Sequence, residues 1–135
     1  MSRKIFVNLP VKDLDRAIAF FTGLGFAFNP QFTDSTATCM IISDSAFAML
    51  LVESKFTSFT TKKIADTSTA SETILALSAD DRAAVDALAD KAIATGGSVA
   101  MPPMDLGFMY GRSFYDPDGH HWEVFHMDPT AMPSD

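Results

Sequence analysis

The sequence contains a single cysteine, Cys39, among its 135 residues. One thiol cannot form an internal disulfide, and it excludes a zinc site built from several cysteines. Long hydrophobic runs are also missing, because the longest wholly apolar stretch, Ala46–Val52, is far shorter than the roughly 20 residues of a membrane-spanning helix. The opening segment MSRKIFVNLP has no apolar core behind its basic pair, which argues against a secretory signal. We therefore expect a cytoplasmic protein that has no membrane partner.

Basic residues are scarce. Ten Lys and Arg residues stand against seventeen Asp and Glu residues, which gives a net charge of −7. This excess of negative charge disfavours a nucleic-acid partner, because phosphate backbones attract basic surfaces. The charge is uneven: residues 1–67 hold seven basic and six acidic residues, whereas residues 68–135 hold three and eleven. The chain therefore changes character near its middle.

The pattern of apolar residues predicts the same order of elements twice, strand, helix and three strands. In the first half the strands are 4–11, 27–32, 37–43 and 46–53, with a helix from Asp13 to about Leu24. In the second half they are 72–78, 98–101, 109–115 and 121–127, with a helix that begins at Asp80 or Asp81 and stops at Gly96. We interpret this repetition as a duplicated module.

The predicted fold class is α+β, with two βαβββ modules that form mixed sheets around a cavity. We expect one domain over residues 1–128, with modules at 3–54 and 72–128, a linker at 55–71 and a tail at 129–135. In each module the helix covers one sheet face only, so the two remaining faces would line a shared cavity for a small-molecule ligand.

Two motifs carry a resemblance to a known family. FVNLPVKDLDRAIAFF begins at Phe6 and is followed by GLGF at Gly23, and the closing motif DPDGHHWE runs from Asp116 to Glu123. Together they resemble the start and the last hairpin of the glyoxalase, bleomycin-resistance and extradiol-dioxygenase proteins, the vicinal-oxygen-chelate superfamily. The resemblance extends from about Lys4 to Asp128 and includes the duplication.

The resemblance implies one metal ligand on the first strand and one on the last strand of each module, usually His or Gln, Glu, His and Glu. Here these positions hold Phe6, then Leu51 or Glu53, then Ile74, and finally Glu123. Phenylalanine and isoleucine cannot bind a metal. We therefore expect no cofactor, and a divalent metal would need a displaced site that uses Glu53, His121 and Glu123, with Asn8 beside them.

The candidate catalytic residues are Glu123 and His121, a carboxylate and an imidazole two residues apart on one strand face. The candidate ligand-binding residues are apolar or polar groups on the predicted cavity strands and in the segment rich in Met and Phe: Phe6, Asn8, Leu51, Glu53, Ile74, Met104, Phe108, Met109 and Arg112. That segment suits an adaptable wall over an apolar or aromatic ligand, and it equally suits a subunit interface. We expect a homodimer.

The turn Asp116–Gly119 determines what faces Glu123. A simple four-residue loop would place Arg112 opposite Glu123 as a neutralising partner, whereas a bulge at Gly119 would shift the register by one residue. Trp122 points to the other face and is expected in the core under the second helix. His120 and His126 share one face, and Cys39 is expected to be a buried, inert thiol.

These observations favour a metal-free small-molecule-binding protein similar to the bleomycin-resistance type. The alternative from the same resemblance is a glyoxalase-like lyase or isomerase, or an extradiol-type dioxygenase, with a displaced divalent metal. A weaker alternative is metal-free catalysis with Glu123 or Glu53 as general base.

Overall fold

The computed structural model describes residues 3–131. The chain forms two compact units, one up to Ala65 and one from Asp66, and each is described here by itself. The boundary between them falls inside the segment 55–71, which the sequence predicts to be a linker. Among the described residues, no helix is both long and apolar enough to cross a membrane.

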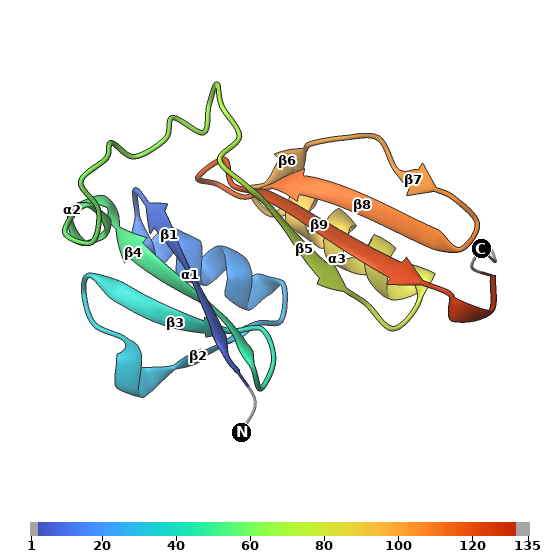
Figure 1. Ribbon diagram of the computed structural model, residues 1–135, viewed down its shortest axis with the longest axis horizontal. Helices are drawn as coiled ribbons and strands as arrows, with labels where there is room; N and C mark the ends of the chain where they lie inside the picture. Colours follow the sequence, from blue (N-terminus) through green and yellow to red (C-terminus); the bar gives the residue numbers. More distant parts are fainter. Residues whose placement is uncertain (1–2, 132–135) are drawn as a thin grey trace. The chain divides into compact units, whose positions relative to one another are not determined.

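The first unit contains a four-stranded sheet (Figure 1). Its elements are β1 (Ile5–Val11), α1 (Leu14–Gly23), β2 (Ala27–Asn29), a 3-10 turn (Pro30–Phe32), β3 (Ala37–Ile41), β4 (Ala46–Val52) and α2 (Glu53–Thr57). The strand order is β1-β4-β3-β2, in which β1 and β4 run parallel and the other neighbours antiparallel.

The second unit repeats this topology. Its elements are β5 (Ile74–Ser78), α3 (Arg82–Ala94), β6 (Ser98–Val99), β7 (Met104–Asp105), β8 (Met109–Tyr115), β9 (His121–Met127) and a 3-10 turn (Pro129–Ala131). The strand order is β5-β9-β8-β6, with β5 and β9 parallel, and the short β7 pairs with β8. The predicted α+β fold with two βαβββ modules is therefore confirmed.

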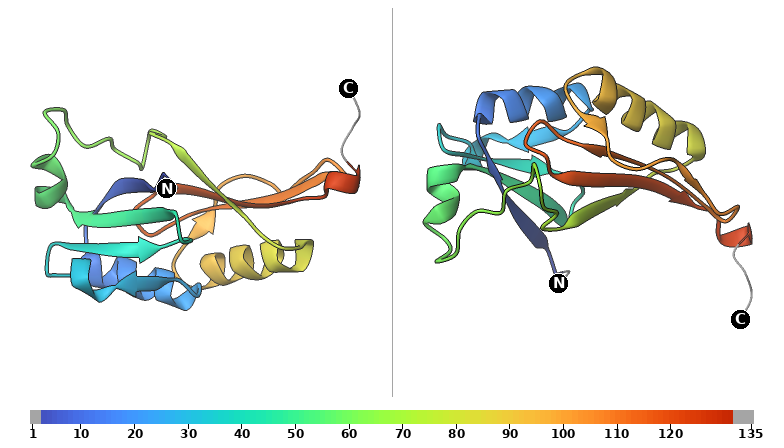
Figure 2. Two further views of the ribbon diagram at one scale, coloured as in Figure 1. Left: turned by 60° about the horizontal axis from the view of Figure 1, so that its bottom comes forward. Right: turned by 90° about the horizontal axis from the view of Figure 1, so that it is seen from above.

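Each unit's helix covers one face of its own sheet (Figure 1 and Figure 2). Both helices begin where the sequence places a capping aspartate: the side chain of Asp13 accepts a hydrogen bond from the backbone of Arg16, and Asp81 does the same for Ala84. In the second unit Val85 and Ala89 of α3 pack against Val124 of β9. Within residues 66–131 no α-helix lies along the opposite face of the second sheet, and in the first unit the short α2 also contacts β1 and β4.

Several predicted boundaries differ from the structure. The second strand ends at Asn29, because Pro30 starts a 3-10 turn. The fourth strand ends at Val52, and Glu53 is instead the first residue of α2, so its predicted place on the strand face is wrong. Of the predicted tail 129–135, residues 132–135 lie outside the described residues.

The register of the β8–β9 hairpin overturns one prediction. Ser113, not Arg112, lies opposite Glu123, and Arg112 lies opposite Val124 on the face that α3 covers. The reason is the turn: Asp116 and His120 close a loop of three residues in which Gly119 has a φ of +81°. This left-handed glycine forms the bulge that shifts the pairing by one residue.

Gly119 cannot accept a side chain without strain. A Cβ there would lie 2.7 Å from Oγ1 of Thr67 and 3.1 Å from the carbonyl oxygen of Thr67, in addition to the positive φ. We expect Gly119→Ala to lower the free energy of unfolding by about 1–3 kcal/mol in urea denaturation. Gly23→Ala is the matched control, because a Cβ at this last residue of α1 meets nothing within 4 Å. Equal stability of the two variants would contradict the bulge argument.

Candidate functional site

The uncovered face of the first sheet is apolar at its edge strand. Phe6 on β1 lies beside Phe47 on β4, with stacked rings whose centroids are 4.8 Å apart, and 51% of Phe6 is exposed. Asn8 lies on the same face and is exposed, and its side-chain amide donates to the backbone carbonyl of Phe6. Leu51 shares this face but is buried. Glu53, on α2, is exposed and does not join this strand face.

The uncovered face of the second sheet brings together most of the predicted site residues of that unit. Ile74 on β5 is 56% exposed and lies opposite His121 on β9. The pairing of β7, β8 and β9 places three further residues on this face: Met104, Met109 and Glu123. The result is a hydrophobic surface with one carboxylate and one imidazole.

Glu123 occupies the middle of this surface. It is partly buried and lies between Ser113 on β8 and Ala76 on β5. One carboxylate oxygen lies 3.9 Å from the point where a Cβ on Gly111 would be. Gly111 is itself buried and has no side chain, so it borders the carboxylate with its backbone only.

His121 lies two residues before Glu123 on the same face. Its ring is only 8% exposed and packs edge-on against Tyr115, with centroids 5.3 Å apart and planes at 64°. This contact orients the imidazole against the Tyr115 ring. Tyr115 is not among the site residues predicted from the sequence, although its alternation with Ser113 along β8 places both on this face.

Arg112 lies on the covered face in a cluster of charges. Its guanidinium donates to Asp86 and Asp90 of α3, each at 2.8 Å. The hydrogen bond to Asp90 is the main reason that the pKa of Arg112 is raised above its ordinary value. The hydroxyl of Tyr110 donates to Asp86 and, together with Arg112, holds the pKa of that carboxyl below its usual value. Arg112 is therefore fully engaged away from Glu123.

Phe108 also departs from the predicted cluster. It lines a cavity of about 370 Å³ near the start of α3, together with Arg82, Tyr110 and His126. Arg82 is held there by both oxygens of Asp105 and lies over the ring of Tyr110. Phe108 and Met109 are neighbours in sequence, but strand pairing puts only Met109 on the uncovered face.

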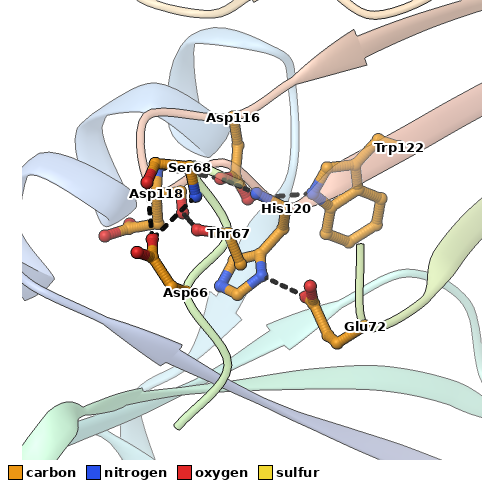
Figure 3. A network of polar contacts seen from close by, with 8 residues as sticks. All are labelled: Asp66, Thr67, Ser68, Glu72, Asp116, Asp118, His120 and Trp122. Atoms are coloured by element: carbon orange, nitrogen blue, oxygen red, sulfur yellow. Dashed lines mark hydrogen bonds and ion pairs between the residues drawn. The ribbon is translucent and has the colours of Figure 1, made fainter. Parts of the chain in front are cut away.

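A buried polar network holds the β8–β9 turn in place (Figure 3). Asp116 is 5% exposed and accepts hydrogen bonds from the backbone of Asp118 and His120 and from the indole nitrogen of Trp122. Burial raises the pKa of the Asp116 carboxyl, and the three donors oppose that rise. The prediction that Trp122 belongs to the core is confirmed, since it is 1% exposed.

The same network ties the segment before β5 to the turn. The imidazole of His120, which is 1% exposed, contacts the carboxylate of Glu72 at 2.7 Å. The hydroxyl of Thr67 donates to the carbonyl of Asp118 (Figure 3). These contacts link residues about fifty positions apart in sequence, so periodicity could not reveal them.

The residues at the implied metal positions do not fit a metal. Phe6 and Ile74 offer no donor atoms, and Leu51 offers none either. Within the described part of the chain, residues 3–131, no three His, Cys, Asp or Glu side chains lie together in an arrangement that could hold a metal ion. The single thiol, Cys39, is 2% exposed, and burial raises its pKa.

The family can now be assigned. Residues 5–124 match the Glyoxalase/Bleomycin resistance protein/Dioxygenase superfamily. The chain belongs to this superfamily. No curated protein matches it significantly. The resemblance of the two end motifs is therefore confirmed at the level of the superfamily, which includes proteins with several different activities.

Solved structures agree with this assignment. A hypothetical protein from S. aureus has 26% identity and a TM-score of 0.78, covering 93% of this chain and 95% of its own. A family enzyme from Burkholderia phytofirmans PsJN has 16% identity and a TM-score of 0.77, covering 93% and 99%. A structure described as lactoylglutathione lyase from Agrobacterium tumefaciens has 18% identity and a TM-score of 0.68, covering 93% and 94%. The last two likenesses show the fold alone.

We expect the hydrogen bonds of Asp116 to stabilise the β8–β9 hairpin. In Asp116→Asn the new amide would turn donor atoms toward the Trp122 indole or lose one backbone partner. We expect a loss of about 1–3 kcal/mol in the free energy of unfolding, together with a changed emission of the single tryptophan. Asp44→Asn, at an exposed turn position, is the control with the same change of charge. Unchanged stability and emission in Asp116→Asn would show that the network does not support the hairpin.

Proposed function

We propose that this superfamily member is a metal-free binding protein for an apolar, aromatic small molecule. The observation that carries the proposal is the chemistry of Phe6 and Ile74. Both occupy positions where the resemblance implies metal ligands, and both are more than half exposed on the uncovered face of their sheet. Large exposed apolar side chains in such positions favour contact with a hydrophobic ligand.

The neighbouring side chains support the same proposal. The stacked pair of Phe6 and Phe47 offers a flat aromatic surface to which a further ring could add. Met104 and Met127 are both partly exposed on the uncovered face of the second sheet, and methionine adapts its shape to irregular ligands. That the two uncovered faces line one cavity stays a prediction.

The proposal is tested with a neutral aromatic probe, 2-naphthylmethanol, by calorimetric titration and thermal unfolding. We expect binding, and Phe6→Ser and Ile74→Ser should each weaken it by about tenfold, because each removes apolar area that the ligand would cover. The control variants are Phe32→Ser, in the 3-10 turn after β2, and Val99→Ser, on the covered side of the second sheet; these residues are 61% and 59% exposed. If all four variants lose the same affinity for the probe, the proposal is wrong, because the loss would then not depend on the uncovered faces.

The enzymatic alternative is a glyoxalase-like lyase or isomerase, or an extradiol-type dioxygenase, with a displaced metal. It predicts a stoichiometric divalent metal in the purified protein that Glu123→Ala removes. We expect elemental analysis after dialysis to find less than one tenth of an equivalent of metal, as an order of magnitude for a chain without a three-donor site. A full equivalent that depends on Glu123 would replace the binding proposal by the enzymatic one.

A homodimer belongs to the same proposal. Met101 and Leu106, in the segment between β6 and β8, are 59% and 54% exposed. Apolar side chains of this size are typical of subunit contacts. We expect light scattering to give twice the 14.6 kDa mass of the chain, and Met101→Ser with Leu106→Ser to shift the protein toward monomer. A monomer at all concentrations of the unchanged protein would contradict this part of the proposal.

A further inference from the structure

Glu123 lacks a compensating charge in its own unit. The structure describes residues 66–131 of that unit, and within them no side chain or backbone group donates a hydrogen bond to its carboxylate or forms an ion pair with it. The nearest polar neighbour across the ladder, Ser113, uses its hydroxyl oxygen to accept from the backbone of Met101. The carboxylate is nevertheless partly buried on an apolar face.

All three Lys and Arg residues of the second unit belong to the other side of its sheet. Arg112 contacts Asp86 and Asp90, and Arg82 contacts Asp105. Lys91 lies on α3, which covers that side. The fold therefore collects the cations of this unit around α3. Among residues 66–131, the other titratable side chains that strand pairing places on the face of Glu123 are the imidazole of His121 and the phenol of Tyr115.

A partly buried carboxylate without a partner is unfavourable, because apolar surroundings replace the water that would solvate it. The charge of the region increases this effect, since residues 68–135 hold eleven acidic and three basic residues. An anionic ligand would be repelled from such a face. A cationic group would gain both the ion pair and the hydrogen bond.

The space next to Glu123 suits a small cationic group. Gly111 pairs with Phe125, diagonal to Glu123, and presents no side chain; a Cβ there would make only ordinary contacts of 3.7–3.9 Å, the longest of them with a carboxylate oxygen of Glu123. Glycine at this position leaves room for a group of the size of an ammonium. The surrounding side chains, among them Ile74 and Phe125, are apolar and could contact the rest of the molecule.

We propose that the ligand of this face is an aromatic molecule with a protonated amine, and that the amine donates to the Glu123 carboxylate beside Gly111. This inference rests on the proposed binding function and specifies its ligand class. An organic cation needs one carboxylate and apolar walls, both of which are present. A divalent metal needs several donors, which the described residues do not bring together.

Three probes share a naphthalene ring and differ in the charge of the attached group: 2-naphthylmethylamine is cationic, 2-naphthylmethanol is neutral and 2-naphthoate is anionic. In calorimetric titration near neutral pH, we expect the amine to bind the unchanged protein at least about tenfold more tightly than the alcohol, and the carboxylate most weakly. Glu123→Gln should remove this preference, with the affinity for the amine falling about tenfold and the affinity for the alcohol changing less than about twofold.

Two controls accompany the titration. Asp44→Asn makes the same change of charge at an exposed turn position and should leave all three affinities within about twofold. Gly111→Ala should keep the fold but weaken the amine more than the alcohol, because its methyl group narrows the space at Glu123. Thermal unfolding of ligand-free Glu123→Gln should show an unchanged or higher melting temperature, since an unpaired carboxylate is removed.

The outcomes distinguish the two proposals. If amine and alcohol bind equally and Glu123→Gln changes neither, the amine inference is wrong, while the binding function stands. If the carboxylate probe binds most tightly, the amine inference is again wrong. If none of the three probes binds, both proposals fail.

Discussion

The bulge at Gly119 is the constraint on which the candidate site depends. It places one additional residue in the turn between β8 and β9, so that Ser113 lies opposite Glu123. With the register one residue different, Arg112 would face Glu123 and neutralise it. Instead the guanidinium joins Asp86 and Asp90 at α3, and the carboxylate remains without a cation of its own unit.

The polar network around the turn explains why this register is stable. Asp116 collects three hydrogen bonds in a buried position, and one of them comes from the indole of Trp122 under α3. His120 and Thr67 connect the turn to the segment that leads into β5. The turn, the core and the start of the second unit therefore support one another.

The second unit separates its charges by sheet face. The covered side holds the arginines with their aspartate partners, and the uncovered side holds one carboxylate among apolar side chains. Such a separation leaves the apolar surface for contact with another molecule. It also makes the charge of a bound group a feature that the site can select, because no protein cation of this unit competes for Glu123.

Much of the fold could be predicted from the sequence. Local signals decided the order of elements: Asp13 and Asp81 cap their helices, glycines end them, and alternation marks β8 and β9. The resemblance of the two end motifs to the superfamily also held, whereas the assignment of Phe6 and Ile74 to the positions of metal ligands stays a prediction. The boundary at Glu53 was missed because no glycine or proline separates β4 from α2, and sequence alternation alone does not show where a strand becomes a helix.

The sequence by itself determined which chemical groups are available: one cysteine, few cations in the second half, and apolar residues at two implied ligand positions. Only the tertiary structure decided which of these groups meet. A shift of one residue in a hairpin exchanges the partners of every side chain along two strands, and the bulge that causes it depends on contacts with Thr67 and with the core. For that reason Arg112 and Glu123, which the motif alone would pair, lie on opposite faces of the same sheet.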